Sequence, residues 1–227
     1  MQTSSSYFRR PLDTILSSEG AVRVLRELYM QASPLAAPAL TDRTRLSHVA
    51  VLKILRGLVR TGILRALGSG RSVLYEIETG HPFASVLRPM FILEHERVQA
   101  TLAALRSVAG EIKPAPAAAW LYGSVARGDD TPESDMDIAL IVRREEDVER
   151  VTDALREGLH ALSEAEMITF SVVGLSLRDV ARLGSSRDPF WKDIARDAIV
   201  LMGLRPAAAL NEAKRPAKKR RTKGTTE

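Results

Sequence analysis

The sequence contains no cysteine, and this absence excludes several kinds of chemistry. Across 227 residues there can be no disulfide framework, no thiolate nucleophile and no zinc site with cysteine ligands. Long hydrophobic runs are also missing, because no window of about 18 uninterrupted apolar residues occurs. The stretch from Met1 to Arg10 lacks the hydrophobic segment of a signal peptide. We therefore expect a cytoplasmic protein with no membrane partner.

Aromatic residues make up only 5% of the chain, but 45% of the residues are hydrophobic, which is ample for packed cores and excludes wholesale disorder. The net charge of +5 is distributed unevenly. Residues 1–80 carry 11 basic against 6 acidic side chains, residues 81–204 carry 14 against 20, and residues 205–227 carry 8 against 2. A basic front, an acidic middle and a basic tail predict modules with different partners.

The first 80 residues show the pattern of three helices followed by a hairpin. Apolar residues recur at helical spacing over 19–31 and over 47–60, and a short helix is expected between these two stretches. The segments 63–67 and 72–77 flank a glycine-rich turn and predict two paired strands.

This order of elements resembles the winged helix-turn-helix family, and the resemblance covers residues 34–64, with Arg45 where relatives usually have a glycine in the turn. Members of the family bind double-stranded DNA by placing the third helix in the major groove. The resemblance places the DNA contacts on that helix and on the wing, at Ser47, His48, Lys53, Arg56 and Arg71. Ser47 is expected to cap the helix or contact the DNA backbone. Use of the same fold for protein contacts is the alternative.

Residues 81–111 predict a linker helix between two modules. Gly80 interrupts the preceding pattern, and a helix over about residues 89–108 follows. One stripe of this helix is apolar and comprises Phe91, Val98, Leu102 and Leu105. Packing on the protein's own domains explains the stripe, and a seam between two copies, which would make the helix a homodimer contact, explains it as well.

Residues 112–204 alternate between strand-like and helix-like segments, which predicts an α/β (α+β) domain. The expected strands are 117–122, 135–142 and 167–173. A helix is expected over 145–162, and two more begin at Ser176 and Asp188. The tail, 205–227, is rich in Ala, Lys, Arg and Pro and is predicted to be disordered.

The segment 120–142, W-L-Y-G-S-V-A-R-G-D-D-T-P-E-S-D-M-D-I-A-L-I-V, contains the residues best suited to chemistry. Gly123 allows a backbone turn to approach a bulky anion, and Ser124 adds a hydroxyl group at the start of a short helix, where free N–H groups favour phosphate. Asp135 and Asp137 are two residues apart at the start of a strand, so both side chains leave the same face. Such carboxylates repel each other unless a cation lies between them, and Mg²⁺ suits that arrangement with nucleotide phosphates completing its oxygen shell.

The pattern Gly-Ser, ten residues, then Asp-x-Asp resembles the nucleotidyltransferase superfamily of DNA polymerase beta over about residues 112–204. The short length is similar to that of the minimal nucleotidyltransferases of bacteria and archaea. The resemblance implies a mixed sheet and transfer of a nucleotidyl group from an NTP to a hydroxyl acceptor. Asp135 and Asp137 would be the catalytic residues and would bind Mg²⁺ or Mn²⁺.

The same resemblance assigns the nucleotide contacts. Gly123 and Ser124 would hold the triphosphate of the NTP. Arg127 would neutralise phosphate charge, although a surface salt bridge explains this arginine equally well. Lys192 and Arg196, on the last expected helix, are further candidates for that role.

The third carboxylate of the family lies on the next central strand and helps to activate the acceptor hydroxyl. Residues 167–173 contain no acid, and the alignment places Ser171 at the expected position. Loss of a general base lowers a rate by roughly 10²–10⁴-fold. Two functions are therefore open: a nucleotidyltransferase coupled to a DNA-binding winged helix, or a transcription regulator whose degenerate domain senses nucleotide or binds a partner. The resemblance also implies a partner protein from a toxin–antitoxin or defence operon.

Overall fold

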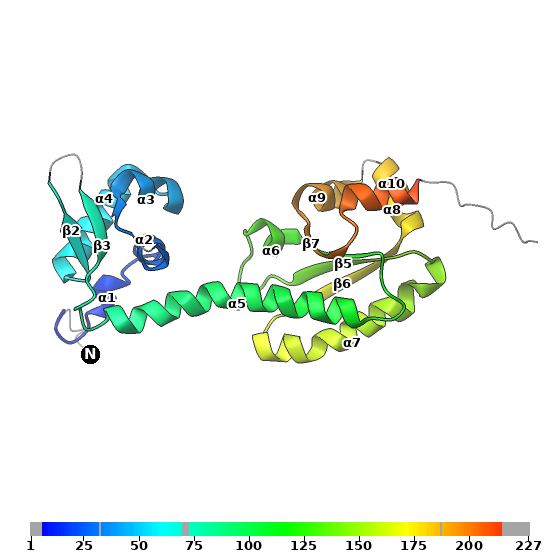
Figure 1. Ribbon diagram of the computed structural model, residues 1–227, viewed down its shortest axis with the longest axis horizontal. Helices are drawn as coiled ribbons and strands as arrows, with labels where there is room; N and C mark the ends of the chain where they lie inside the picture. The colour runs from blue at the N-terminus through cyan, green and yellow to red at the C-terminus, as the bar shows by residue number, and fades with distance from the viewer. Residues whose placement is uncertain (1–5, 32, 70–72, 187, 215–227) are drawn as a thin grey trace, which may run out of the picture. The chain divides into compact units, whose positions relative to one another are not determined.

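The chain, seen as a computed structural model, is described over residues 6–31, 33–69, 73–186 and 188–214. Its internal contacts divide it into two compact units, residues 1–98 and residues 99–227 (Figure 1). Within the described stretches, no helix combines the length and the apolar character needed to cross a membrane.

The first unit combines helices with a small sheet. The helices are α1 (Leu12–Ile15), α2 (Glu19–Met30), α3 (Ala37–Thr44) and α4 (His48–Thr61), and the strands are β1 (Leu35–Ala36), β2 (Leu64–Leu67) and β3 (Leu74–Ile77). β3 is the central strand and pairs antiparallel with both neighbours. The sequence pattern predicts α2, α3, α4 and the hairpin, whereas α1 and β1 are elements that it does not predict.

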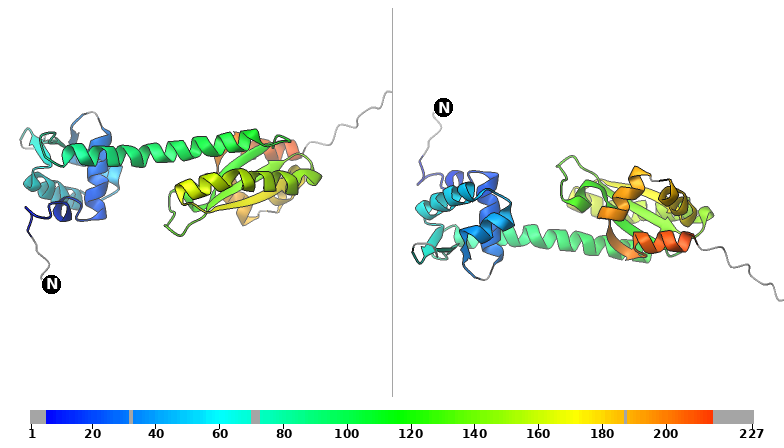
Figure 2. Two further views of the ribbon diagram at one scale, coloured as in Figure 1. Left: turned by 90° about the horizontal axis from the view of Figure 1, so that it is seen from below. Right: turned by 90° about the horizontal axis from the view of Figure 1, so that it is seen from above.

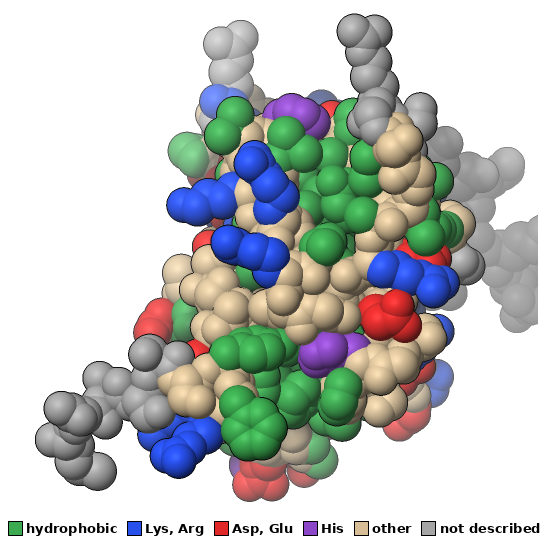
Figure 3. Space-filling view, turned by 90° about the vertical axis from the view of Figure 1, so that its left-hand side faces the viewer, with side chains coloured by type: hydrophobic (Ala, Val, Ile, Leu, Met, Phe, Trp, Pro, Cys, Tyr) green, Lys and Arg blue, Asp and Glu red, His purple; other side chains and the backbone are tan. Residues whose placement is uncertain are grey.

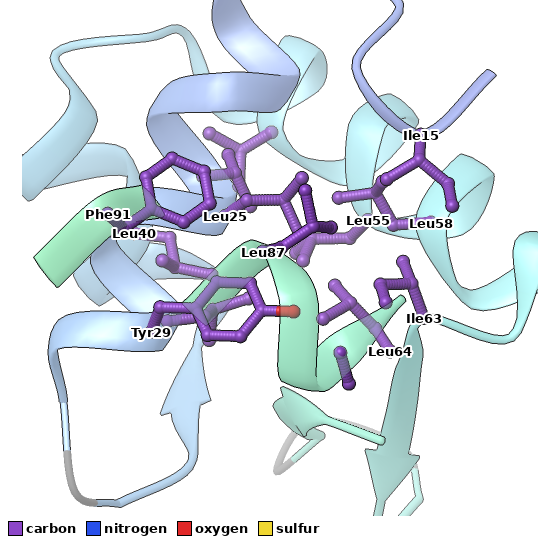
Figure 4. Close-up of a cluster of buried hydrophobic side chains, with 14 of the residues drawn as sticks. Ile15, Leu25, Tyr29, Leu40, Leu55, Leu58, Ile63, Leu64, Leu87 and Phe91 are labelled. Atoms are coloured by element: carbon purple, nitrogen blue, oxygen red, sulfur yellow. The ribbon is translucent and has the colours of Figure 1, made fainter. Parts of the chain in front are cut away.

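Serine caps explain where α2 and α4 begin. The hydroxyl oxygen of Ser18 accepts a hydrogen bond from the backbone N–H of Ala21 at 3.2 Å, and that of Ser47 accepts one from Ala50 at 3.3 Å. The apolar faces of the helices and the hairpin meet in one core (Figure 4), whose fully buried members include Leu25, Leu40, Leu55 and Ile63.

Arg45 closes the turn between α3 and α4 in the left-handed conformation, with φ 56° and ψ 28°. For residues with a Cβ this conformation costs roughly 1–2 kcal/mol, whereas glycine adopts it freely. The arginine therefore takes up the backbone geometry that the winged-helix resemblance would assign to a glycine.

Helix α5 (Ala84–Glu111) begins in the first unit and ends in the second. The expected start near residue 89 is wrong, because Pro89 lies inside the helix. Proline weakens a helix by removing a hydrogen bond. Here the turns around it are held by burial of Leu87 and Phe91 in the first core.

The apolar stripe expected along this helix divides into two parts. Phe91 is buried in the first core, and Leu105 is buried in the second. Val98, between them, is 56% exposed. Packing within the chain therefore accounts for both ends of the stripe, and a homodimer contact over 89–108 stays a prediction.

The second unit is built on a mixed four-stranded sheet. Its strands are β4 (Ala118–Tyr122), β5 (Met136–Val142), β6 (Phe170–Ser176) and β7 (Ile199–Gly203), in the order β6-β5-β4-β7. β5 and β6 are parallel, and the other pairs are antiparallel. The helices are α6 (Gly123–Arg127), α7 (Val148–Glu166), α8 (Leu177–Ser185), α9 (Pro189–Asp197) and α10 (Pro206–Ala213), with a 3₁₀ turn, η1 (Glu145–Asp147).

Helices cover both faces of this sheet (Figures 1 and 2). Along β5, Ile138 and Leu140 face the cluster formed with α7 and the end of α5. Ala139 and Ile141 face the opposite cluster, formed with α8, α9 and α10. This period-2 alternation assigns Asp137 to the α9 side of the sheet.

Three expectations for this unit need correction. The strand expected at 167–173 is β6, shifted toward the C-terminus, because α7 continues to Glu166 and ends at Met167 with φ 52°. β7 is a fourth strand that the sequence analysis does not predict. The tail expected to be disordered from residue 205 contains α10, in which Ala209 is fully buried. The expected capping box of Ser176 and Asp179 is confirmed.

Candidate functional site

Two carboxylates lie at the start of β5. Asp137 is the second residue of the strand and is half-buried, and Asp135 immediately precedes the strand and is exposed. Within the described part of the chain, neither carboxylate has a hydrogen bond or an ion pair. Such carboxylates retain their full capacity to accept ligands or bind a cation.

The turn that follows β4 lies directly against Asp137. Gly123 has φ +79°, and a Cβ placed on it would come within 2.3 Å of the Asp137 Oδ2 atom. Both the backbone conformation and the close approach therefore require glycine. Ser124 follows at the start of α6, and its carbonyl accepts hydrogen bonds from Gly128 and Asp129. Its hydroxyl has no hydrogen-bond partner among the described residues.

Strand pairing fixes the two neighbours of Asp137. Tyr122 of β4 is its partner on one side, and Ser171 of β6 is its partner on the other. The placement of Ser171 beside the acid pair is thereby confirmed. The described residues contain no group of three or more His, Cys, Asp or Glu side chains able to hold a metal ion. The chain therefore offers two carboxylates here, with a hydroxyl in place of a third.

Tyr122 adds a polar aromatic group that the sequence analysis did not select. Burial, assisted by the negative charge of Asp137, raises the pKa of its phenol to about 12. Its ring packs edge-on against Phe190, with 5.2 Å between the ring centroids. The phenol is therefore a neutral donor beside the carboxylates. Its position directly before Gly123 in the motif was the available sequence clue.

The basic residues near this site differ in their pairing. Arg127 donates to Asp129 at 3.1 Å, a hydrogen bond that raises the pKa of the arginine. Arg196 is bound to two aspartates of its own helix, Asp193 and Asp197. Lys192, also on α9, has no ion pair within the described residues and is exposed.

A second candidate surface lies on α4. Lys53, Arg56 and Arg60 share one face of the helix, are exposed, and have no carboxylate partner in the described stretches. They line a cleft of about 690 Å³ together with Val49 and Tyr75. Figure 3 shows basic side chains beside a hydrophobic area on this unit. Arg60 was not selected from the sequence, although its position four residues after Arg56 indicates the same helix face.

The other residues selected for DNA contact have different surroundings. Ser47 caps α4, as expected, and its hydroxyl oxygen is used for that purpose. His48 is exposed, with its Nδ1 atom 3.3 Å from the hydroxyl of Thr41. Arg71 lies outside the residues that the structure describes.

Comparison with known proteins gives one match. Residues 109–202 match the family model described as "Polymerase beta, Nucleotidyltransferase". No curated protein and no solved structure gives a significant match. The matched residues include β4 to β6, both aspartates and the glycine turn. Residues 109–202, within the second unit, are therefore similar to the nucleotidyltransferases of the polymerase beta type.

Proposed function

We propose that the second unit transfers a nucleotidyl group from an NTP to a hydroxyl acceptor, with Asp135 and Asp137 as its catalytic residues. The observation that supports this most strongly is the pair of unpartnered carboxylates beside the Gly123 turn, inside the stretch that matches the family. Two neighbouring carboxylates repel each other, and a bound cation removes this repulsion.

The side chains present fit a divalent cation with oxygen ligands. Asp135 and Asp137 would hold Mg²⁺ or Mn²⁺, and water molecules and nucleotide phosphates would complete the oxygen shell of the ion. The described residues add no third carboxylate to this shell. The bound ion would stabilise the charge that develops on the attacking and leaving oxygens.

The remaining groups have roles that follow from their positions. The Gly123 turn and the free Ser124 hydroxyl would hold phosphate oxygens, and Lys192 on α9 is a further cation without an ion pair among the described residues. Ser171 does not remove a proton from the acceptor as a carboxylate does. We therefore expect turnover roughly 10²–10⁴-fold slower than with a third acid.

Thermal unfolding tests this proposal without knowledge of the acceptor. Each NTP would be added with Mg²⁺ to the wild-type chain and to an Asp135→Asn/Asp137→Asn variant. A ligand present at about 100 times its dissociation constant stabilises by about 2.7 kcal/mol. This corresponds to an upward shift of several degrees, at about 2–4 °C per kcal/mol. We expect the shift in the wild type alone.

Asp130→Asn is the matched control, because Asp130 is an exposed acid of the same loop that precedes β5. It should respond to nucleotide as the wild type does. If no NTP shifts the wild-type transition, or if the double variant responds equally, the assignment of the acid pair is wrong.

The basic face of α4 favours a second function, binding of double-stranded DNA by a winged-helix domain. The three helices and hairpin of the first unit have the element order of that fold. Lys53, Arg56 and Arg60 have no ion pair with any described residue, and they lie on the helix that would enter the major groove. Arginine and lysine contact phosphates and guanine edges, which suits this placement.

The salt dependence of DNA affinity tests this second proposal. Each phosphate contact adds about 0.9 to the slope of log affinity against log salt concentration. Replacing Lys53, Arg56 and Arg60 by alanine should therefore weaken binding and lower the slope by about 2–3. Arg106→Ala, which removes an exposed arginine of α5, is the control. An unchanged slope in the triple variant would exclude DNA recognition by α4 and favour protein contacts.

If the second unit binds NTP and the first binds DNA, the protein could be a DNA-binding regulator that responds to NTP and not an enzyme. Ser171 beside Asp137 is the observation that favours this alternative. A regulator would bind NTP without transferring it, and NTP would change its affinity for DNA. Measuring DNA affinity with and without NTP, alongside label transfer from NTP, separates the two functions.

A further inference from the structure

The exposed face of α4 that carries the cations begins with an apolar side chain. Val49 lies in the first turn of the helix and is 75% exposed. Intervals of four, three and four residues separate the exposed members of this face, which is the spacing of one side of an α-helix. In chain order, the members are Val49, Lys53, Arg56 and Arg60. A hydrocarbon group therefore precedes three positive charges on the same face.

The core of the first unit does not use Val49. The positions of α4 that face this core are Val51, Leu55 and Leu58, and all three are buried. Of the large hydrophobic side chains on α4, Val49 is the one that is exposed. Valine also has a lower helix propensity than alanine. Folding therefore does not account for a valine at this position.

The two residues before Val49 have polar side chains that the fold uses. The hydroxyl oxygen of Ser47 accepts the hydrogen bond that caps the helix. The Nδ1 atom of His48 lies 3.3 Å from the hydroxyl of Thr41. The isopropyl group of Val49 is therefore the side-chain surface of this turn that the fold leaves unused.

Val49 and the three cations line the same cleft of about 690 Å³. The rest of its lining comes from α4 and from both strands of the hairpin, through Val59, Ala66 and Tyr75. The described residues of this lining include no acid. Positive charge beside hydrocarbon suits a polyanion that also presents apolar groups.

The major groove of DNA presents both kinds of group. A recognition helix directs its N-terminal residues to the base edges, and lysine and arginine also contact the phosphates. The base edges carry hydrogen-bond donors and acceptors, and the C5-methyl group of thymine is the apolar group among them. A valine placed against a polar edge would bury donors or acceptors without partners, which is unfavourable. At the first turn of α4, an isopropyl group therefore matches thymine.

We propose that Val49 is a specificity-determining residue that packs against the C5-methyl group of a thymine in the major groove. The inference rests on the DNA binding by α4 proposed above, and it adds the kind of base that the helix selects. Lys53, Arg56 and Arg60 supply affinity for any sequence, whereas Val49 distinguishes thymine from bases without the methyl group.

Replacement of thymine by uracil tests this contact directly. Duplexes bound by the full chain are first selected from a random-sequence library, and each thymine of a selected duplex is then replaced by uracil. Uracil lacks the C5-methyl group and keeps the hydrogen-bonding groups of thymine. We expect at least one replacement to weaken binding about fourfold, the effect of about 0.8 kcal/mol for one buried methyl group. Fluorescence anisotropy of the labelled duplexes measures the affinity.

A variant at the same position assigns the effect to Val49. In Val49→Ser the sensitive uracil replacement should have no effect on affinity, because the apolar partner of the methyl group is gone. The slope of log affinity against log salt concentration should stay that of the wild type, since no charge is removed. Val86→Ser, at a valine of α5 that is 57% exposed, is the matched control and should keep the fourfold effect. Circular dichroism checks that both variants fold.

The possible failures separate this inference from the proposal on which it rests. If no duplex is selected, DNA binding by the first unit is wrong, the role of Val49 is wrong with it, and protein contacts become the use of this face. If duplexes bind with the expected salt dependence and uracil replaces every thymine without loss, DNA binding stands and the role of Val49 is wrong. Equal sensitivity to uracil in the wild type and in Val49→Ser would also overturn the inference, because another side chain would then contact the methyl group.

Discussion

At the scale of single residues, Tyr122 provides a spectroscopic probe of Asp137. The pKa of the phenol is raised to about 12 by burial and by the neighbouring carboxylate. Asp137→Asn removes the negative charge, so the midpoint of Tyr122 ionisation should move from about 12 toward 10 without reaching it, because burial remains. Tyrosinate absorbance in a pH titration measures this shift, with Tyr122→Phe to identify the transition. An unchanged midpoint would contradict the contact.

The raised pKa of Tyr122 also sets the sign of a stability change in alkali. The unfolded chain ionises this phenol near its ordinary pKa of 10.0, before the folded chain does so near 12. The contribution of the neutral phenol to stability is therefore complete below pH 10 and is lost as the pH rises toward 12. Denaturant unfolding at pH 9 and at pH 11, in the wild type and in Tyr122→Phe, would show a smaller loss in the variant.

Arg45 offers a second test at this scale. Its left-handed backbone costs roughly 1–2 kcal/mol, which glycine would relieve, while glycine also increases the entropy of the unfolded chain. Arg45→Gly should therefore leave the free energy of unfolding unchanged or raise it by up to about 1 kcal/mol. Arg43→Gly, within the last turn of α3, should lower it by about 1 kcal/mol. Equal destabilisation by both changes would show that the Arg45 backbone is not strained.

At the scale of secondary-structure elements, α7 packs on β6 through a position that only glycine fits. A Cβ on Gly174 would lie 2.0 Å from the hydroxyl oxygen of Thr152, which is itself buried. Gly174→Ala should therefore separate the helix from the strand and lower the free energy of unfolding by about 1–3 kcal/mol. Gly110→Ala, in α5 where a Cβ meets nothing within 4 Å, should raise it by about 0.5–1 kcal/mol. Chemical denaturation of both variants checks the opposite signs.

Elements with local determinants were predictable from sequence, and elements that depend on distant contacts were not. Ser18, Ser47 and Ser176 cap helices through hydrogen bonds to residues three positions ahead, so sequence alone indicates where those helices begin. β1 and β7 exist only through pairing with strands far along the chain. The start of α5 was missed for a related reason, because burial of Leu87 outweighs the local effect of Pro89.

In the candidate site, too, some features follow from local sequence and others depend on distant contacts. The Gly-Ser turn and the two aspartates follow from a short motif, and strand alternation places both acids on one face. The neighbours of Asp137 depend on the register of three strands, which local sequence does not determine. The position of Tyr122 beside Asp137 therefore emerges only from the folded chain, whereas the ion pairs of Arg127 and Arg196 join residues that are close in sequence.

At the scale of the whole molecule, each unit has its own core, so changes within one core should act on one unit. Leu25 is fully buried in the first core, and Leu25→Ala should cost about 2–5 kcal/mol. In differential scanning calorimetry we expect two transitions, one for each unit. Leu25→Ala should lower the midpoint temperature of one of them, and the midpoint of the transition that NTP with Mg²⁺ raises should not change. Leu155→Ala, at an equally buried position of α7, should have the reverse effect. A single merged transition in all samples would show that the units unfold together.

The parallel pairing of Ser171 with Asp137 has a consequence for protein engineering. Side chains at paired positions of neighbouring strands point to the same face about 4.8 Å apart, so Ser171→Asp would add an acid beside the existing pair without a change of backbone. This single replacement would provide the three carboxylates that the nucleotidyltransferase resemblance implies. If the proposed transfer reaction occurs, the ratio of its rates in the aspartate and serine forms would measure the contribution of this one side chain.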